Sequence, residues 1–534
     1  MGIVKNPILS GFYPDPSVCA VDTVTEDGSK KRVYYLVNST FCYTPGVPIF
    51  YSEDLCEWTQ IGHVLTKETQ LNLDGLAMSK GIYAPTIRYH KGTFYMITTN
   101  VMGGGNFYVT ATDPAGEWSE PVYLPDAEGI DPSLFFDGDT CYYVGQRNKK
   151  DGEYFGDCEI WIQELDLKQG KLVGEIHSLW DGAMKHAIWP EGPHLYKKDD
   201  YYYLMIAEGG TAYEHSICVA RSKELFGPYE SYRSNPVFTH RHLGHGMEIQ
   251  NTGHGDLVED ADGNWYIFML ATRPVKDCAP LGRETFVAEV KWEEDWPVIN
   301  PGVGQLRKYQ PVGNMTEAEY EKAMKTFADN EDSLRVEVIS LPWTDPLDKK
   351  CVFFRYPQEG MYKIETLSNG KTALGLLLSE NTFEDEKAPS YIGVRVTDMS
   401  FALSTNVSVD NADDADDAEA GLVYLHDEQN YVKWVLQKEN GVSNISLIHV
   451  EDGVAKVLYC KKAAKENPDL KLGLKDMMLY AFADGECIDV IVDACDLTSE
   501  RKGGFTGCTI GVYAATAKKG SDTYALFSDT KIER

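Results

Sequence analysis

The sequence predicts an all-β protein, a five-bladed β-propeller followed by a C-terminal β-sandwich. Three observations predict this fold. One short phrase recurs five times in the first part of the chain, helical periodicity is nearly absent, and the repeat ends at a charged segment beyond which plain strands follow. The length of 534 residues also exceeds what one ordinary core supports. We place the propeller at residues 1–315 and the sandwich at residues 325–534.

Each copy of the phrase consists of a turn residue, a short apolar strand, a polar hairpin and an aromatic second strand. The first copy contains FYPDPS and, further on, VYYLVNST. The other four are YAPTIRYHKGTFYMITTN from Tyr83, DPSLFFDGDTCYYVGQ from Asp131, EGPHLYKKDDYYYLMIAE from Glu191 and HGDLVEDADGNWYIFML from His254. A further strand follows each copy, such as FVAEVKWEEDWPVI after the fifth. Units of three to four short antiparallel strands, repeated five times, are typical of propeller blades.

The second domain begins after MTEAEYEKAMKTFADN, the one segment with a helical pattern. The sandwich strands are expected in VFFRYP, ALGLLLSE, YIGVRVTD, AGLVYLHDEQNYVKWVLQ, MMLYAFADG, CIDVIVDA and CTIGVYAAT. The acidic run DNADDADDAEAG, residues 410–421, is interpreted as a solvated loop in preference to a metal site.

The charge balance restricts the partners. With 82 acidic and 50 basic residues, the net charge is −32. Such a field repels nucleic acid and acidic membranes, so neither is expected as a partner, and a neutral or cationic ligand is favoured. No apolar stretch is long enough to span a membrane. A homo-oligomer is left open.

The cysteines and the N-terminus indicate the compartment. Twelve cysteines are scattered without a Cys-x-x-Cys pair or a zinc-type His cluster, which favours free thiols in a reducing environment. The N-terminal sequence MGIVK lacks the pattern of a secretory signal. A cytoplasmic location is therefore expected, with secretion left open if a signal has been trimmed.

Acidic residues stand in register with the repeat. The first strand of each propeller blade lines the central axis, so equivalent positions of different blades meet at one end of the channel. The positions just before the aligned proline or glycine are Asp15, Ala84, Asp131, Gly192 (preceded by Glu191) and His254. Three carboxylates and an imidazole are thus expected at one point.

Converging carboxylates suit two kinds of chemistry. They can bind a cation such as Ca²⁺, or they can hydrolyse a glycoside by general acid/base catalysis. Hydrolysis needs one protonated and one ionised carboxyl, and a third carboxylate nearby helps to separate their pKa values. Glu191 beside Trp189 and Pro190 has an apolar setting suited to a raised pKa. Asp15, among polar turn atoms, suits the ionised partner.

Several long motifs resemble glycoside hydrolase family 43, in particular its β-xylosidases with a C-terminal β-sandwich. They are NPILSGFYPDPS, GIYAPTIRYHKGTFY, GIDPSLFFD, WPEGPHLY, EGGTAYEHSICVARS, NTGHGDLV and LGRETF, and the resemblance spans nearly the whole chain. It implies an exo-acting β-1,4-xylosidase that releases D-xylose from the non-reducing ends of xylo-oligosaccharides by single displacement with inversion. The alternative is α-L-arabinofuranosidase as main or side activity. A non-catalytic sugar-binding propeller is a third hypothesis, but it has no need for acids in register.

The resemblance also assigns roles to single residues. It implies that Asp15 is the general base that activates water and Glu191 the general acid. Asp131 corresponds to the residue that tunes the pKa of the acid. His254 and Arg283 match residues around the terminal-sugar subsite. No cofactor is expected, and His254 is interpreted as a hydrogen-bonded channel histidine, with a Ca²⁺ there as the alternative.

Three aromatic residues are expected to bind substrate. Phe41 matches an apolar wall of the pocket. Tyr83 stands where close relatives usually have Trp, which leaves the balance of substrates open. Core packing is the alternative for both rings. Phe505 lies on the glycine-flanked tip GGFTG, and such a tip can approach another surface closely. The matching loop in the xylosidases that the chain resembles reaches over the propeller, so the resemblance implies that Phe505 contacts the second sugar.

Overall fold

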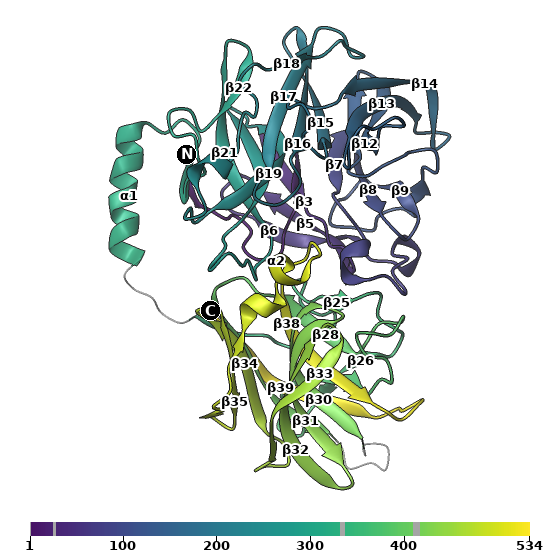
Figure 1. Cartoon of the computed structure of the whole chain (residues 1–534), viewed down its shortest axis with the longest axis vertical. Helices are drawn as coiled ribbons and strands as arrows, with labels where there is room; N and C mark the ends of the chain where they lie inside the picture. Colours follow the sequence, from purple (N-terminus) through teal and green to yellow (C-terminus); the bar gives the residue numbers. More distant parts are fainter. Residues whose placement is uncertain (1, 25–27, 332–336, 410–416) are drawn as a thin grey trace.

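The computed structural model describes residues 2–24, 28–331, 337–409 and 417–534. It confirms the predicted fold: a five-bladed propeller in the upper half of Figure 1 and a β-sandwich in the lower half. Helix α1 (Glu317–Glu331) lies at the side, where the helical pattern was predicted. Most of the acidic run, residues 410–416, lies outside the described residues. No described helix is long and apolar enough to cross a membrane.

Five four-stranded antiparallel sheets form the blades. The first blade consists of β2 (Ser17–Val24), β3 (Lys30–Val37), β5 (Gly46–Ser52) and β6 (Thr59–Leu65), and the second of β7 (Thr86–His90), β8 (Thr93–Asn100), β9 (Gly105–Ala111) and β10 (Val122–Tyr123). The third consists of β11 (Ser133–Asp137), β12 (Thr140–Asn148), β13 (Cys158–Asp166) and β14 (Lys171–Trp180), and the fourth of β15 (Glu191–Lys198), β16 (Tyr201–Glu208), β17 (Ser216–Ser222) and β18 (Glu230–Ser231). The fifth consists of β19 (Gln250–Glu259), β20 (Trp265–Thr272), β21 (Glu284–Glu293) and β22 (Trp296–Ile299). The chain ends of the propeller meet where β1 (Gly2–Lys5) pairs with β23 (Tyr309–Val312).

The innermost strands share one unusual backbone feature. The residue before the aligned proline or glycine has a left-handed conformation in four blades, with φ of 52° at Asp15, 53° at Asp131, 57° at Gly192 and 46° at His254. This conformation is costly for residues other than glycine, and such strain gathers at functional sites. The repeated turn therefore supports the register seen in the sequence.

A buried polar network lies two to four residues further along the same strands. The Asp256 carboxylate accepts hydrogen bonds from Arg88 (2.8 Å), Ser17 (2.7 Å) and Tyr196 (2.6 Å), and His194 lies 2.9 Å from the Arg88 guanidinium. Burial alone would raise the pKa of Asp256, but Arg88, His194 and Tyr196 together outweigh burial and hold the pKa well below its usual range. The network joins the first, second, fourth and fifth blades across the axis.

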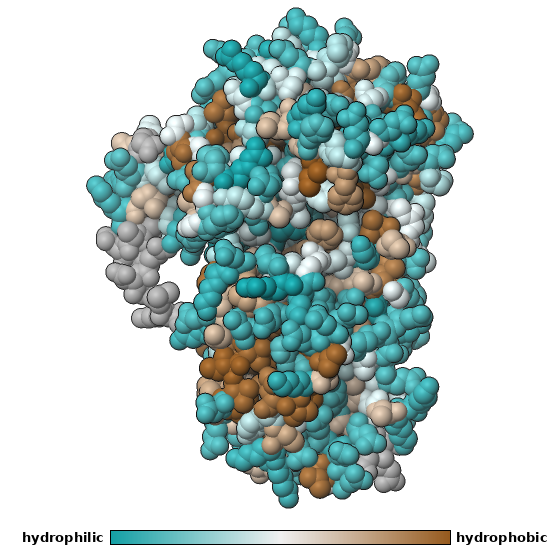
Figure 2. All heavy atoms as spheres, viewed as in Figure 1, coloured by the Kyte–Doolittle hydropathy of each residue, from teal (hydrophilic) through white to brown (hydrophobic). Residues whose placement is uncertain are grey.

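The sandwich consists of a nine-stranded and a six-stranded antiparallel sheet. The first contains β24 (Val338–Ser340), β26 (Tyr362–Thr366), β27 (Thr372–Leu377), β29 (Ser400–Val409), β34 (Asp469–Lys475), β35 (Met478–Ala483), β36 (Glu486–Cys487), β37 (Val492–Asp493) and β39 (Tyr524–Glu533). The second contains β28 (Tyr391–Arg395), β30 (Ala418–Asp427), β31 (Asn430–Glu439), β32 (Val442–Glu451), β33 (Val454–Lys462) and β38 (Thr509–Thr516). On the face shown in Figure 2 the surface is mostly hydrophilic, with one concentrated apolar area over this domain.

Two predicted sandwich strands differ from the structure. In VFFRYP only β25 (Phe353–Phe354) is a strand, and it pairs with β4 (Tyr43–Thr44) of the propeller. In CIDVIVDA the two-residue strand β37 is followed by a 3₁₀ turn from Ala494 to Leu497. Apolar strand composition alone does not identify the partner of a strand, and here the other domain supplies it.

The two domains share one hydrophobic core. Phe12, Phe41 and Ile82 of the propeller belong to the same buried cluster as sandwich residues. Those sandwich residues are Val352, Phe354, Phe383, Tyr391, Val423, Leu425, Tyr431, Tyr513 and others. A shared core of this kind resembles an obligate interface more than a mobile contact between domains.

We therefore predict that a fragment ending near residue 320 is insoluble or inactive, because it exposes the apolar face that the sandwich covers. Soluble yield, size-exclusion behaviour and glycosidase activity of the fragment check this, with the full chain as control. A monodisperse and fully active fragment would show that the sandwich supports neither the fold nor the site.

Candidate active site

A small cavity of about 80 Å³ lies at the mouth of the propeller channel. It brings together all eight residues predicted for the site. The lining consists of Asp15, Phe41, Tyr83, Ala84, Ile130, Asp131, Glu191, Thr211, His215, His254, Leu270, Arg283 and Phe505. A larger cleft of about 1550 Å³ shares Tyr83, Glu191, Thr211, Arg283 and Phe505 with it, so the cavity adjoins an open groove.

Asp15 is a buried carboxylate held by a cation. The Arg283 guanidinium donates a hydrogen bond of 2.8 Å from Nη1 to Oδ1 of Asp15, and both side chains are largely buried. The Ser39 hydroxyl donates to the other carboxylate oxygen. A carboxylate removed from water needs hydrogen-bond partners of this kind.

Glu191 has the opposite environment. It begins β15, directly after Trp189 and Pro190, and no described cation pairs with it. Burial raises its pKa well above the usual range, and the negative charges of Asp131 and Asp15 raise it further, while Arg283 opposes them. The environment of Glu191 therefore favours its protonated form over the carboxylate.

Asp131 is the third buried carboxyl of the cavity, and its pKa is also raised. Its pKa is raised to about 6, because burial and the charge of Asp15 raise it more than His254, Arg283 and the Gly192 N–H lower it. The Gly192 N–H donates a hydrogen bond to it, which ties Asp131 to the residue next to Glu191. Two buried carboxyls that interact so closely titrate as a pair.

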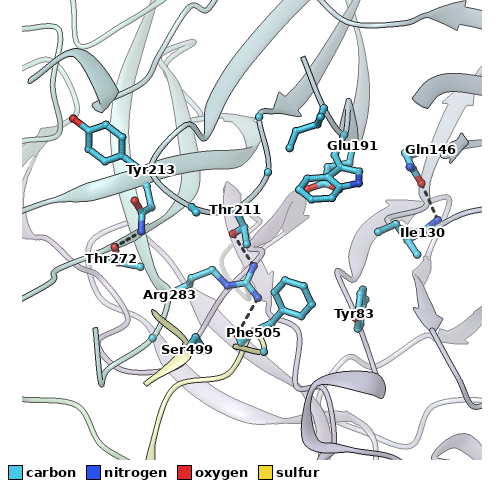
Figure 3. A pocket seen from close by; sticks show the side chains of 18 of the residues that line it. Tyr83, Ile130, Gln146, Glu191, Thr211, Tyr213, Thr272, Arg283, Ser499 and Phe505 are labelled. Atoms are coloured by element: carbon cyan, nitrogen blue, oxygen red, sulfur yellow. Dashed lines mark hydrogen bonds between the residues drawn. The ribbon is translucent and has the colours of Figure 1, made fainter. Parts of the chain in front are cut away.

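Arg283 connects the propeller to the sandwich. Its Nη1 also lies 3.2 Å from the Thr211 hydroxyl, and its Nη2 donates to the Phe505 carbonyl at 3.2 Å. The guanidinium lies over the rings of Phe41 (5.6 Å) and Phe505 (6.0 Å). Figure 3 shows Arg283 between Thr211 and Phe505, with Tyr83 across the cleft. The sandwich loop thus supplies both a ring and a backbone acceptor to the site.

A second contact fixes the same loop to the propeller. The Phe505 N–H donates to the Ser79 hydroxyl (2.9 Å), and the Tyr83 hydroxyl donates to the Ser79 carbonyl (3.0 Å). We call these two hydrogen bonds the Ser79 latch. Phe505 also stacks on Phe41, with ring centroids 6.1 Å apart. The hydroxyl of Tyr83 is therefore directed to the pocket wall, and burial raises its pKa to about 12.

His254 and two other histidines surround the channel. His254 is buried beside Asp131, and its ring centroid lies 6.5 Å from that of His194. Burial lowers the pKa values of His194 and His215 to about 3, so both are neutral. Nε2 of His194 has no hydrogen-bond partner among the described residues. A search of those residues finds no group of three or more His, Cys, Asp or Glu suited to a metal ion.

Sequence reasoning missed four residues of this site. They are Ser39, Ser79, Thr211 and His215. Thr211 and His215 lie inside the motif EGGTAYEHSICVARS, which was used only for the resemblance. Ser39 and Ser79 act through hydrogen bonds to residues distant in sequence, and no local pattern marks them.

A cavity at the mouth of a five-bladed propeller that holds three carboxyls, one paired with Arg283 and two with raised pKa values, is typical of a glycoside hydrolase. Comparison with known proteins gives the family: residues 4–297 match the model of glycosyl hydrolases family 43, to which the chain belongs. Residues 343–533 match the beta xylosidase C-terminal concanavalin A-like domain.

Relatives cover the full length. The chain is similar to a xylosidase/arabinosidase of Butyrivibrio fibrisolvens (45% identity, 100% of both chains). It is also similar to a non-reducing end alpha-L-arabinofuranosidase of Bacteroides ovatus (34% identity over 96% of this chain and 91% of the relative). Among solved structures it resembles the xylan beta-1,4-xylosidase of Bacillus halodurans (TM-score 0.83, 30% identity, 99% and 100% coverage). The protein is thus a glycoside hydrolase with xylosidase or arabinofuranosidase activity.

The charge of Asp131 leads to a prediction on pH dependence. Asp131→Asn removes a negative charge that raises the pKa of Glu191, so that pKa falls and the acid loses its proton at lower pH. We expect the alkaline limb of the kcat/KM profile to move to lower pH by about one unit. A pH profile on a nitrophenyl glycoside measures this. The control is Glu53→Gln, which removes an exposed carboxylate of the first blade. An alkaline limb at its wild-type position would contradict the assigned coupling.

The Ser79 latch leads to a second prediction. Ser79→Ala leaves the Phe505 N–H without its acceptor, and we expect kcat/KM on a disaccharide substrate to fall roughly two- to tenfold, mainly through KM. Ser79→Thr keeps a hydroxyl and should retain the wild-type value. Because the latch acts through Phe505, the effects of Ser79→Ala and Phe505→Ala should not add in the double variant. Additive losses would show that Ser79 acts elsewhere.

Proposed function

We propose that the protein is an exo-acting, inverting β-1,4-xylosidase that releases D-xylose from the non-reducing ends of xylo-oligosaccharides. One observation carries the proposal. The same buried cavity keeps Glu191 neutral and gives Asp15 a cationic partner, so an acid and a base face one small space. That division of protonation states is what hydrolysis of a glycoside requires.

In the proposed mechanism Asp15 accepts a proton from a water molecule as the water attacks the anomeric carbon. Glu191 donates its proton to the glycosidic oxygen, and the rest of the oligosaccharide departs with that oxygen as a hydroxyl group. The released xylose carries the oxygen of the water, and its anomeric centre is inverted. Asp131 acts through the pKa of Glu191, which its negative charge raises. Inverting enzymes place the two carboxyl groups roughly 6.5–9.5 Å apart so that this water fits between them.

The shape of the cavity supports exo action. Its volume is small, and Phe505 and Phe41 close it on one side. Nη1 and Nη2 of Arg283 already hold Asp15, Thr211 and the Phe505 carbonyl, so the guanidinium fixes three groups around the cavity. His254 and Tyr83 complete the walls around the terminal sugar. In this proposal Phe505, 39% exposed at the junction with the cleft, contacts the second sugar.

A second activity is proposed on a specific observation. The relative of Bacteroides ovatus is named an α-L-arabinofuranosidase, and the relative of Butyrivibrio fibrisolvens carries both names. An arabinofuranosyl unit offers hydroxyls similar to those of xylose, so the same acid and base serve both sugars. We therefore propose α-L-arabinofuranosidase as a side activity, or as the main activity if the assay below ranks it first.

The remaining expectations are proposals of the same kind. Hydrolysis by two carboxyls needs no metal, and exhaustive chelation should leave the rate unchanged. Activity lost on chelation and restored by Ca²⁺ would place a cation at His254 instead. Cytoplasmic location stays a prediction that rests on the cysteine pattern.

The experiment that tests the function compares nitrophenyl β-D-xylopyranoside with nitrophenyl α-L-arabinofuranoside, for wild type and for Asp15→Asn and Glu191→Gln. Asp15→Asn should lose roughly 10²- to 10⁴-fold in turnover on the nitrophenyl substrates, and Glu191→Gln should lose as much on xylobiose, whose departing hydroxyl needs the proton. Both should keep the wild-type circular dichroism spectrum, and Glu53→Gln should keep full activity. Proton NMR of the first product from a β-xyloside should show α-xylose.

Three results would contradict the proposal. Turnover above about a tenth of wild type in either variant, on the substrate named for it, would remove the role of that residue. Early β-xylose would indicate double displacement. A much higher kcat/KM on the arabinofuranoside would make that sugar the main substrate.

A further inference from the structure

The outer cleft has an aromatic rim that the proposed chemistry does not use. Among the described residues, Phe155 is the most exposed large apolar side chain, at 81%. Its ring packs edge-on against Trp189, with centroids 5.4 Å apart. Trp189 lines the cleft and stands two residues before Glu191. We call Phe155 and Trp189 the aromatic rim.

Phe155 is exposed although its loop is firmly braced. The loop of residues 149–157 joins β12 to β13, and the loop of residues 181–190 joins β14 to β15. Two hydrogen bonds join these loops. The Tyr154 hydroxyl donates to the Ala187 carbonyl (2.9 Å), and the backbone N–H of Trp189 donates to the Gly156 carbonyl (2.8 Å). Lys149 adds ion pairs to an acid on each loop. A braced backbone that presents a bare ring beside a cleft is typical of a preorganised binding surface.

The position of the rim identifies its ligand. Glu191 donates its proton to the leaving-group oxygen in the proposed mechanism, so the leaving chain departs on the side of Glu191. Trp189 lies next on that wall, packed close enough to Gly210 that a Cβ there would be 2.8 Å from the indole. Phe155 lies one ring further out. The order is therefore catalytic cavity, cleft wall, exposed ring.

We propose that the aromatic rim is a subsite for xylosyl units of the leaving group beyond the second sugar. The inference rests on the proposed function, because it takes Glu191 as the acid and Phe505 as the contact of the second sugar. Neutral pyranose rings have apolar faces that stack on aromatic side chains, and they carry no charge for the −32 net charge to repel. The subsite would make the enzyme favour longer xylo-oligosaccharides over xylobiose.

The test measures binding so that it does not depend on turnover. The full chain with Glu191→Gln, which mimics the neutral acid, is titrated with xylobiose and with xylotetraose by calorimetry. We expect the tetramer to bind more tightly. Adding Phe155→Ala should reduce that preference about five- to tenfold, the effect of losing roughly 50 Å² of buried apolar contact. Phe155→Tyr keeps a ring and should keep the preference.

Phe226→Ala is the matched control. Phe226 is another exposed phenylalanine of the propeller (45%). Neither Phe155 nor Phe226 lines the cleft itself, but Phe155 packs on Trp189, which does, whereas Phe226 stacks on His177, which does not. It should leave the preference unchanged. Equal affinity of the parent for the two sugars, no effect of Phe155→Ala, or an equal effect of Phe226→Ala would each overturn the subsite. Failure of wild type to hydrolyse xylobiose would instead overturn the proposed function. The ratio of the dissociation constants for xylobiose and xylotetraose would still show whether the aromatic rim binds the longer chain.

Discussion

The ion pair between Asp15 and Arg283 is the interaction on which the site depends. Asp15 belongs to the first blade, Arg283 directly precedes a strand of the fifth, and the Phe505 carbonyl that also holds Arg283 comes from the sandwich. A buried guanidinium is costly unless acceptors face its donors. The propeller supplies Asp15 and Thr211 to Nη1, the docked sandwich loop supplies the Phe505 carbonyl to Nη2, and Nε has no partner among the described residues. The second domain therefore completes the electrostatics of the catalytic cavity.

The channel holds two sets of buried carboxyls, and their contributions to folding stability change with pH in opposite directions. The pKa values of Glu191 and Asp131 are raised in the folded state, so their contribution to stability is present below their unfolded pKa values and is lost as pH rises through the folded ones. The pKa of Asp256 is lowered by Arg88, so its contribution is present above its unfolded pKa and is lost as pH falls. The deeper network thus stabilises the fold at the neutral pH at which the catalytic carboxyls destabilise it.

The sequence was most informative where the fold repeats itself. Five copies of one phrase predicted the blades, and their register predicted that Asp15, Asp131 and Glu191 meet, because a propeller brings equivalent positions to one axis. The positions of Arg283 and Phe505 came from the resemblance. Long-range pairings were not predictable: β25 pairs with the propeller, and Ser79 accepts from a residue more than four hundred positions away. Such contacts depend on how the domains dock, and no local pattern encodes that.

The Ser79 latch offers a physical explanation for tyrosine at position 83. An indole has a single N–H donor on a different part of the ring, whereas the phenol hydroxyl reaches the Ser79 carbonyl. Ser79 in turn holds the backbone of Phe505, so Tyr83 influences the junction of the cavity with the cleft through two hydrogen bonds as well as through its ring. Most of these links run through backbone atoms. Substrate preference in a site of this design therefore depends on loop position, which a comparison of pocket side chains alone would not reveal.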